Sequence, residues 1–234
     1  MGVIIDKNAD SDVFLQLKEL GIKYCKSADI EYLYRPVNSH PDMQIHFFDY
    51  KTAVAAPCVF DYYRKNLPAN INILKGERNP DRTYPGDCAY NVAKLGKKIV
   101  GNFQYVEPVI KKLYRDAGFE FINTKQGYTK CNMCIIDDNS VITEDKGLAK
   151  VLMEHSIDVI EIPSGTVELQ YFDNGFIGGA SGFLMPETIG FFGNICKNPY
   201  YEKIFSFIKK KNVDIICLLQ TNIKDFGSIL YFPD

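Results

Sequence analysis

The sequence lacks a marked excess of charge of either sign. Its 234 residues include 27 Lys and Arg against 29 Asp and Glu, which gives a formal net charge of −2. Because a chain that wraps nucleic acid usually carries a strongly basic surface, nucleic acid is not an expected partner. The length is sufficient for one continuous hydrophobic core, so we expect a single domain over residues 1–234.

The sequence also lacks a recognisable targeting or membrane segment. Residues 1–10 carry several charged side chains and have no apolar stretch typical of a secretory signal. The longest charge-free stretch, 174–186, is glycine-rich and shorter than the roughly 20 apolar residues of a spanning helix. An odd number of cysteines, seven, lies scattered among apolar residues, as is typical of reduced thiols. We therefore expect a cytoplasmic protein without membrane contact, and the oligomeric state is left open.

Short segments of similar pattern recur along the chain. Each begins with a small or turn-forming residue and continues with the apolar and polar alternation of a half-buried strand. These segments are 21–25, 70–74, 118–122, 156–160 and 212–216. A helix is predicted before each, at 11–20, 60–67, 107–117, 146–155 and 200–211. Before each helix a further strand is predicted, at 2–6, 52–57, 98–102, 140–144 and 188–194.

An opening strand precedes this pattern in four of the five units. The predicted opening strands are 43–48, 88–93, 131–136 and 178–184. The first unit has no opening strand of its own upstream, and the C-terminal strand 227–232 is expected to supply it. The sequence therefore predicts an α/β fold, a five-bladed αβ-propeller of ββαβ units with pseudo-fivefold symmetry, whose first unit is closed by the C-terminal strand.

Two carboxylates occupy equivalent positions in this repeat. His40-Pro41-Asp42 in the second unit aligns with Pro85-Gly86-Asp87 in the third at an offset of 45 residues. A repeated position in a fold with a central pocket tends to face that pocket, although an Asp in such a segment is also common in an ordinary turn. The fifth unit contributes a glycine-rich segment, 178–186.

The five ββαβ units and these three motifs resemble the pentein superfamily, which includes arginine deiminases, agmatine deiminases, dimethylarginine hydrolases and amidinotransferases. The resemblance implies a small cationic guanidine or amidine ligand in a central acidic pocket, held by the carboxylates of Asp42 and Asp87. It also implies that His40 transfers protons and that a thiolate attacks the central carbon of the ligand. No cofactor is implied.

Two features depart from the deiminase pattern. The position that corresponds to the catalytic cysteine of the family is Gly182, which has no nucleophilic side chain. The His-x-Asp segment precedes the segment of Asp87, whereas in the deiminases it follows the Gly-Gly-Asp segment. The resemblance is therefore to a divergent branch without an assigned activity. The superfamily also contains a ribosome-binding translation initiation factor, so the alternative is a non-catalytic interaction protein that binds a macromolecule through the face of the propeller.

Cys131 is the predicted replacement nucleophile. In a strand, the side chains of Cys131 and Cys134 would point to opposite faces, and the chain has only three His, so no metal site is expected. The alternatives are that both thiols are structural, or that Cys131 lines the central pore as a relocated nucleophile.

Three further residues are candidates for ligand binding. Glu168 lies in an alternating run and is expected either to point inward or to be a solvated strand residue. Asn174 belongs to an Asn-Gly turn that either rims the pocket or forms a plain connection, and Ser181 lies beside the vacant nucleophile position.

Overall fold

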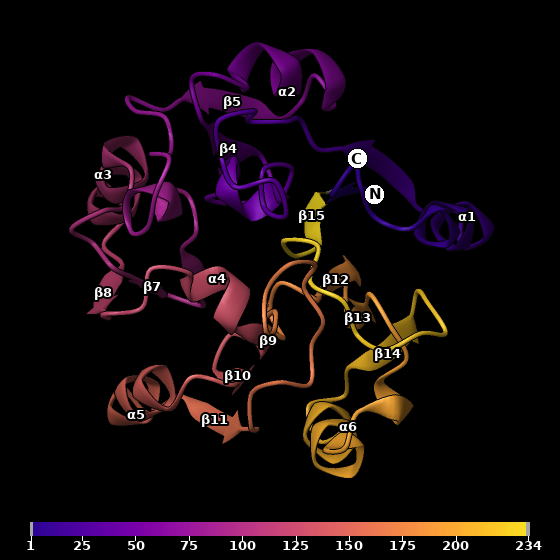
Figure 1. Cartoon of the computed structure of the whole chain (residues 1–234). Coiled ribbons are helices and arrows are strands. Elements are labelled where there is room, and N and C mark those ends of the chain that lie inside the picture. Colours follow the sequence, from indigo (N-terminus) through magenta and orange to yellow (C-terminus); the bar gives the residue numbers. More distant parts are fainter. Residues whose placement is uncertain (1, 233–234) are drawn as a thin grey trace.

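The computed structural model describes residues 2–232, which form a mixed α/β fold with five three-stranded sheets. All five sheets have the same topology, in which the middle strand pairs antiparallel with the opening strand and parallel with the third strand. Figure 1 shows the sheets arranged around a common centre with the longer helices at the periphery. The segments next to the opening strands β9, β12 and β15 therefore lie near the middle of the molecule.

The sheets follow one another along the chain, except that the first is completed by the last described strand. The first comprises β15 (Leu230–Phe232), β1 (Gly2–Ile5) and β2 (Lys23–Lys26), and the second β3 (Ile45–Phe47), β4 (Thr52–Ala55) and β5 (Asn72–Lys75). The third comprises β6 (Ala93–Leu95), β7 (Lys98–Gly101) and β8 (Glu120–Asn123). The fourth comprises β9 (Cys134–Asp137), β10 (Ser140–Thr143) and β11 (Asp158–Glu161), and the fifth β12 (Ser181–Met185), β13 (Thr188–Phe191) and β14 (Asp214–Cys217).

A helix connects the two parallel strands of each sheet. These helices are α1 (Ser11–Glu19), α2 (Phe60–Asn66), α3 (Pro108–Asp116), α5 (Lys146–Glu154) and α6 (Tyr201–Lys209). Four shorter turns of helix are η1 (Pro41–Met43), η2 (Gly86–Cys88), α4 (Thr129–Asn132) and η3 (Ile195–Lys197). The predicted positions of the five longer helices agree with these bounds to within two residues at each end.

The turn that leads from helix to third strand explains where that strand begins. Gly21, Gly118, Ser156 and Asn212 have left-handed backbone conformations, with φ of 69°, 70°, 59° and 57°. Each follows the end of a helix, where a left-handed residue reverses the chain direction. Because this residue and the next belong to the turn, the third strands begin two residues later than the alternating pattern predicts.

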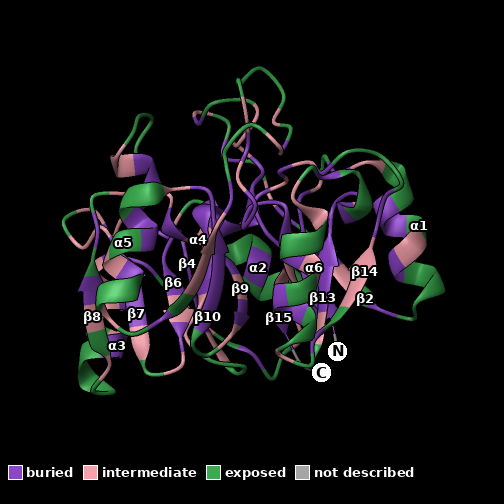
Figure 2. Cartoon of the chain, turned by 90° about the horizontal axis from the view of Figure 1, so that it is seen from below, coloured by how far each residue is buried: buried purple, intermediate pink, exposed green. Residues whose placement is uncertain are grey.

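The interior consists mainly of the middle strands and the helix faces that cover them. All residues of β1 and β10 are buried, and so are Ile204, Phe207 and Ile208 on one face of α6. Figure 2 shows buried strands inside, exposed residues on the outer sides of the helices, and loops that project from one face. The rigid sheets thus hold the central segments in place, and the projecting loops lie above them.

All five opening strands begin later than predicted, by two residues for β3, by three for β9, β12 and β15, and by five for β6. The strand predicted at 88–93 begins only at Ala93, because η2 and the turn after it occupy the preceding residues. The strand predicted at 131–136 begins at Cys134, and Cys131 lies in the short helix α4 instead. The premise that Cys131 and Cys134 share a strand is therefore wrong. The reason is physical: residues 88–93 and 131–134 are all buried, so they show no polar alternation that would separate a helical turn from a strand.

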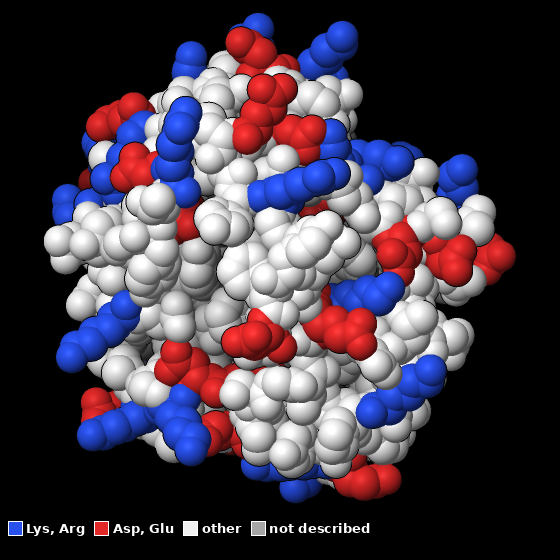
Figure 3. All heavy atoms as spheres, in the orientation of Figure 1, with Lys and Arg blue, Asp and Glu red and all other residues white. Residues whose placement is uncertain are grey.

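Charged side chains of both signs are dispersed over the face that Figure 3 shows. This distribution agrees with the small net charge of the chain. Within residues 2–232, no helix is both long enough and apolar enough to cross a bilayer.

Candidate functional site

Five segments meet at the centre, and each comes directly before the opening strand of a different sheet. They carry Ser228 before β15, Asp42 before β3, Asn91 before β6, Cys131 before β9 and Gly178 before β12. Hydrogen bonds join these residues into one buried cluster. The five-fold repetition of the fold thus delivers a different chemical group from each unit to the same place.

Asp42 and Cys131 are in direct contact at this centre. The Cys131 thiol donates to Asp42 Oδ2 at 3.0 Å, and the Ser228 hydroxyl lies 2.6 Å from the same oxygen. The Lys130 ammonium donates to Ser228 Oγ at 3.1 Å. The other carboxylate oxygen, Asp42 Oδ1, is buried and has no hydrogen-bond partner among residues 2–232. An unpartnered buried carboxylate oxygen is costly, and it has the capacity to accept a donor from a ligand.

Asn91 holds Cys131 from the opposite side. Its Nδ2 donates to the sulfur at 2.9 Å, and its Oδ1 accepts the backbone N–H groups of Lys130 at 2.8 Å and Cys131 at 3.2 Å. The side chain of Asn91 is fully buried. One amide side chain therefore contacts both the sulfur and the backbone that carries it.

The closed site keeps Cys131 protonated. Burial raises the pKa of the Cys131 thiol well above its usual range, and the nearby carboxylates of Asp42 and Asp225 raise it further. The hydrogen bond from Asn91 acts in the opposite direction and lowers this pKa. As described, the residue is thus a neutral thiol that needs a positive charge or a loss of the carboxylate charge to become a thiolate.

His40 lies between two other buried carboxylates. Its Nε2 is 3.8 Å from Asp6 Oδ2, and its Nδ1 is 3.9 Å from Asp225 Oδ1. The ring packs against Gly227, where an added Cβ would come within 2.3 Å of the Cβ of His40. The predicted proton-transfer residue therefore faces Asp6 and Asp225 with both ring nitrogens, and the group that contacts the Cys131 thiol is Asp42.

The centre holds more acidic than basic groups. Burial raises the pKa of both Asp6 and Asp225, the charge of Asp42 raises it further, and His40 lowers it. Three buried carboxyl groups thus influence one another electrostatically around one imidazole. Binding of a cation or uptake of protons stabilises such a cluster, because either one reduces the repulsion between the carboxylates.

Asp87 occupies the equivalent position in the third unit. Asp42 is the middle residue of η1 and Asp87 is the middle residue of η2, as the offset of 45 residues predicts. Both oxygens of Asp87 have partners: the Tyr128 hydroxyl donates to Oδ2 at 2.6 Å, and the Cys88 thiol donates to Oδ1 at 3.2 Å. Burial raises the pKa of the Cys88 thiol, and the charges of Asp87 and Asp42 raise it further, so the two carboxylates lie within electrostatic reach of one thiol.

Aromatic rings extend from Asp87 toward the surface. The ring of Tyr128 lies 5.3 Å from that of Tyr84 and 6.2 Å from that of Phe176. Tyr84 is 51% exposed, whereas Asp42 and Cys131 are only 1% and 4% exposed. The central cluster is therefore closed to solvent, and a ligand reaches it only if side chains in this region move.

The remaining predicted binding residues lie outside the cluster. Glu168 does not point inward: it is exposed and accepts a hydrogen bond from Asn222 at 2.8 Å. Asn174 is half-buried and donates to the carbonyl of the adjacent Gly175 at 3.1 Å. Ser181 is buried in β12 and donates to the carbonyl of Ile177 at 2.8 Å. This hydrogen bond attaches the loop that precedes β12 to the start of the strand.

Sequence reasoning missed four residues of this centre. They are Asp6, Asn91, Asp225 and Ser228. Two of them could have been found from their position in the repeat. Asn91 and Ser228 lie just before opening strands, as Asp42 does. Asp6 and Asp225 come from segments that become neighbours only when β15 pairs with β1.

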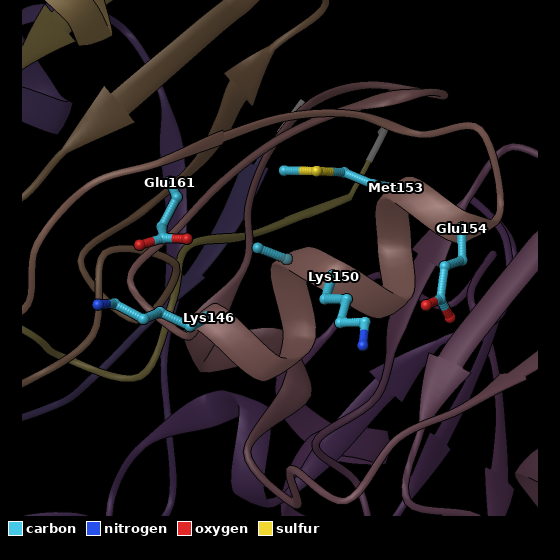
Figure 4. Close-up of a pocket in the computed structure, with 6 residues that line it drawn as sticks. Lys146, Lys150, Met153, Glu154 and Glu161 are labelled. Atoms are coloured by element: carbon cyan, nitrogen blue, oxygen red, sulfur yellow. The ribbon is translucent and has the colours of Figure 1, made fainter.

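A concave surface outside the centre lies on α5. A hollow of about 400 Å³ is lined by Lys146, Ala149, Lys150, Met153, Glu154 and Glu161. Figure 4 shows that these residues come from α5 and from β11 next to it. Its lysines and glutamates are surface residues of mixed charge. In the described part of the chain, no three His, Cys, Asp or Glu side chains are grouped so as to hold a metal ion.

The sequence matches one family model over residues 4–230, that of a family of unknown function named DUF6873. The chain belongs to this family. Comparison of the DUF6873 sequence with curated proteins gives no match.

Solved structures resemble the DUF6873 chain over most of its length. An amidinotransferase of the saxitoxin biosynthetic pathway from Microseira wollei is 12% identical, with a TM-score of 0.51, over 87% of this chain and 74% of that chain. The agmatine deiminase of C. jejuni is 12% identical, with a TM-score of 0.51, over 92% and 75%. A dimethylarginine dimethylaminohydrolase is 10% identical, with a TM-score of 0.52, over 94% and 92%. These proteins are penteins, so the resemblance to the pentein superfamily is confirmed at the level of the fold.

Proposed function

We propose that the protein binds a small cationic guanidine or amidine at its closed centre and that Cys131 attacks the central carbon of this ligand. The observation that carries the proposal is the buried pair of Cys131 and Asp42, in which the thiol donates to Oδ2 and Oδ1 is left without a partner. A planar cation with paired N–H groups supplies both the charge and the donor that this carboxylate lacks.

The charges at the centre favour the same ligand. Asp6, Asp42 and Asp225 are buried around one histidine, and Asp87 adds a further carboxylate near the same thiols. A bound cation between Asp42 and Asp87 offsets this negative charge. It also lowers the pKa of the Cys131 thiol, so the nucleophile is activated when the ligand is present.

The reaction that we propose begins with transfer of the Cys131 proton to Asp42 Oδ2, which leaves a thiolate and a carboxylic acid. The sulfur then forms a bond to the amidine carbon. The C–N bond to the leaving amine breaks as that amine takes up the proton held on Asp42 Oδ2, which returns Asp42 to a carboxylate. Water or a second amine displaces the sulfur in the final step, which makes the activity that of a hydrolase or a transferase.

Access to this centre requires a local opening. Tyr128 covers Asp87 and is itself flanked by the rings of Tyr84 and Phe176. We propose that Tyr128 moves away from Asp87 when the ligand enters and that the guanidinium takes the place of the hydroxyl hydrogen bond.

We further infer that the five sheets are the blades of an αβ-propeller with pseudo-fivefold symmetry and that residues 1–234 form a single domain. The support is the identical topology of the five sheets and the pairing of β15 with β1. All seven cysteines are free thiols, which supports a reducing compartment such as the cytoplasm.

The experiment that tests the proposal compares two thiol reagents of similar size, a cationic haloacetamidine and the uncharged haloacetamide. Labelling of each of the seven cysteines is followed by mass spectrometry of peptides from the intact protein. We expect Cys131 to prefer the cationic reagent by at least 10-fold, because the amidine binds to the carboxylates before it reacts. Cys58, which is exposed and lies outside the centre, is the internal control and should react at similar rates with both.

Two outcomes would contradict the proposal. One is that Cys131 shows the same ratio of rates as Cys58. The other is that Cys131 reacts with neither reagent while the exposed thiols do, which would favour a non-catalytic binding protein.

A further inference from the structure

Asn91 makes an unusual set of contacts with the residue that we propose as nucleophile. Its Nδ2 is 2.9 Å from Cys131 Sγ, and its Oδ1 accepts two consecutive backbone N–H groups, those of Lys130 and Cys131. These N–H groups belong to α4, a helix of only four residues, so the amide oxygen fixes the short segment that carries the thiol.

The partners of Asn91 define which way its amide points. The two backbone N–H groups can only donate, so the atom facing them is the oxygen and the atom facing the sulfur is the NH₂ group. The backbone of Asn91 is held as well, since its main-chain carbonyl accepts a hydrogen bond from the Thr129 hydroxyl at 3.2 Å. With its side chain fully buried and its orientation fixed, the amide aims an N–H donor at Sγ.

The two faces of Cys131 are chemically different. Asp42 on one face is a hydrogen-bond acceptor and favours the protonated sulfur, whereas Asn91 on the other face is a donor and favours the sulfur anion. A donor that is already in place costs no reorganisation when the charge forms.

We infer that Asn91 is a positioning residue for the reaction, which orients Cys131 and stabilises its thiolate through the Nδ2–H to Sγ hydrogen bond. The inference rests on the proposed function, in which Cys131 is the nucleophile. It assigns a role to a residue that neither the motifs nor the family resemblance single out.

The decisive variant is Asn91→Asp. It retains an oxygen for the two backbone N–H groups and replaces the N–H donor by a second oxygen that repels a thiolate. We expect the pH dependence of Cys131 labelling by the uncharged haloacetamide to shift upward by one pH unit or more. At neutral pH this shift lowers the labelling rate at least 10-fold, since one pKa unit corresponds to a factor of ten.

Asn132→Asp is the matched control. Asn132 is the neighbour of Cys131 in α4, is equally buried, and donates to the Tyr128 carbonyl instead of to the sulfur. The control thus adds the same charge next to Cys131 without removing the donor at Sγ. Thermal unfolding checks that both variants fold, and Asn91→Ala, which removes the donor without adding charge, replaces Asn91→Asp if that variant is unfolded.

The outcomes separate this inference from the proposed function. An upward shift in Asn91→Asp that exceeds the shift in Asn132→Asp supports the inference, and equal shifts in the two variants overturn it. The preference of Cys131 for the cationic over the uncharged reagent should remain within about twofold of wild type in Asn91→Ala, because that preference depends on the carboxylates and this variant adds none. If wild type shows no preference, the proposed function fails, while the pH shift still reports on Asn91.

Discussion

Asp42 and Asp87 lie at the same place in the second and third units, yet their surroundings differ. Each is the middle residue of a 3₁₀ turn before an opening strand, and each has a thiol as a hydrogen-bond donor. The thiol at Asp87 is the next residue, Cys88, whereas the thiol at Asp42 is Cys131, which comes from a unit two further along the chain. Asp87 has partners on both oxygens, and Asp42 has a free one.

This difference shows how a repeated backbone can support two roles. The local sequence places both carboxylates at the centre, and the residues that other units contribute decide what each one does. In the proposed reaction, Asp42 receives a proton from Cys131 and meets the ligand with Oδ1, which has no partner among residues 2–232. Asp87 is engaged by Tyr128 and becomes available only when that tyrosine moves.

The largest expected effect separates the two carboxylates. Asp42→Asn removes the charge beside the thiol and the ligand, so we expect the preference of Cys131 for the cationic haloacetamidine to fall about 10- to 100-fold, the equivalent of one charge-assisted hydrogen bond. Asp87→Asn, which retains polar contacts with Tyr128, should lower the same preference less. Peptide-resolved labelling rates measure both. Equal losses in the two variants would show that the carboxylates act as an equivalent pair.

A smaller effect is expected at the contact that closes Asp87. Tyr128→Phe removes the hydroxyl donor to Asp87 Oδ2, a hydrogen bond that is worth about 1–2 kcal/mol. The closed state becomes less favourable, so labelling of Cys131 should become roughly five- to thirtyfold faster with the cationic and the uncharged reagent alike. Tyr84→Phe, at the exposed neighbouring ring, should change these rates less. Unchanged or slower labelling in Tyr128→Phe would mean that this contact does not limit access.

The smallest effect on labelling is expected at Glu144, a buried carboxyl group without a thiol partner. Burial raises its pKa from 4.5 to about 7, although it accepts the Ile177 N–H at 2.9 Å. The folded protein therefore holds this proton more tightly than the unfolded chain, and stability falls as the pH rises from about 4.5 to 7, by up to about 3 kcal/mol.

Glu144→Gln should remove this part of the pH dependence while Cys131 labelling changes less than twofold. Denaturant unfolding at several pH values between 5 and 8 measures the effect. The free energy of unfolding of wild type should decrease relative to that of the variant as the pH rises. Parallel curves would show that Glu144 does not titrate in this range.

Much of the architecture could be predicted, because the repeated order of strands, helices and turns is visible in the sequence. The turn residues Gly21, Gly118, Ser156 and Asn212 mark the start of four third strands, and the helices before them carry apolar residues at helical spacing. The opening segments were harder to predict, because residues such as Cys88 and Cys131 are buried whether the backbone is a strand or a helical turn. Burial on all sides removes the alternation on which strand prediction depends.

The candidate site could be predicted only in part, because some of its residues meet only in the folded chain. The repeat places Asp42 and Asp87 at equivalent positions, and the absence of a nucleophile at Gly182 leads to Cys131 as the predicted replacement. The orientation of His40 toward Asp6 and Asp225 depends on segments that are more than 180 residues apart in the chain. The sequence pattern around Glu168 does not show whether its side chain points inward. Alternation tells the two faces of a strand apart only when the strand belongs to a sheet, and Glu168 forms an isolated bridge with Lys224.

The pairing of β15 with β1 has a consequence for biosynthesis. Asp225 and Ser228 lie just before β15, so the centre cannot be complete until the ribosome has released the segment up to residue 232. The central cluster is thus assembled only after β15 has joined β1, whereas the other four sheets need no strand from beyond residue 217.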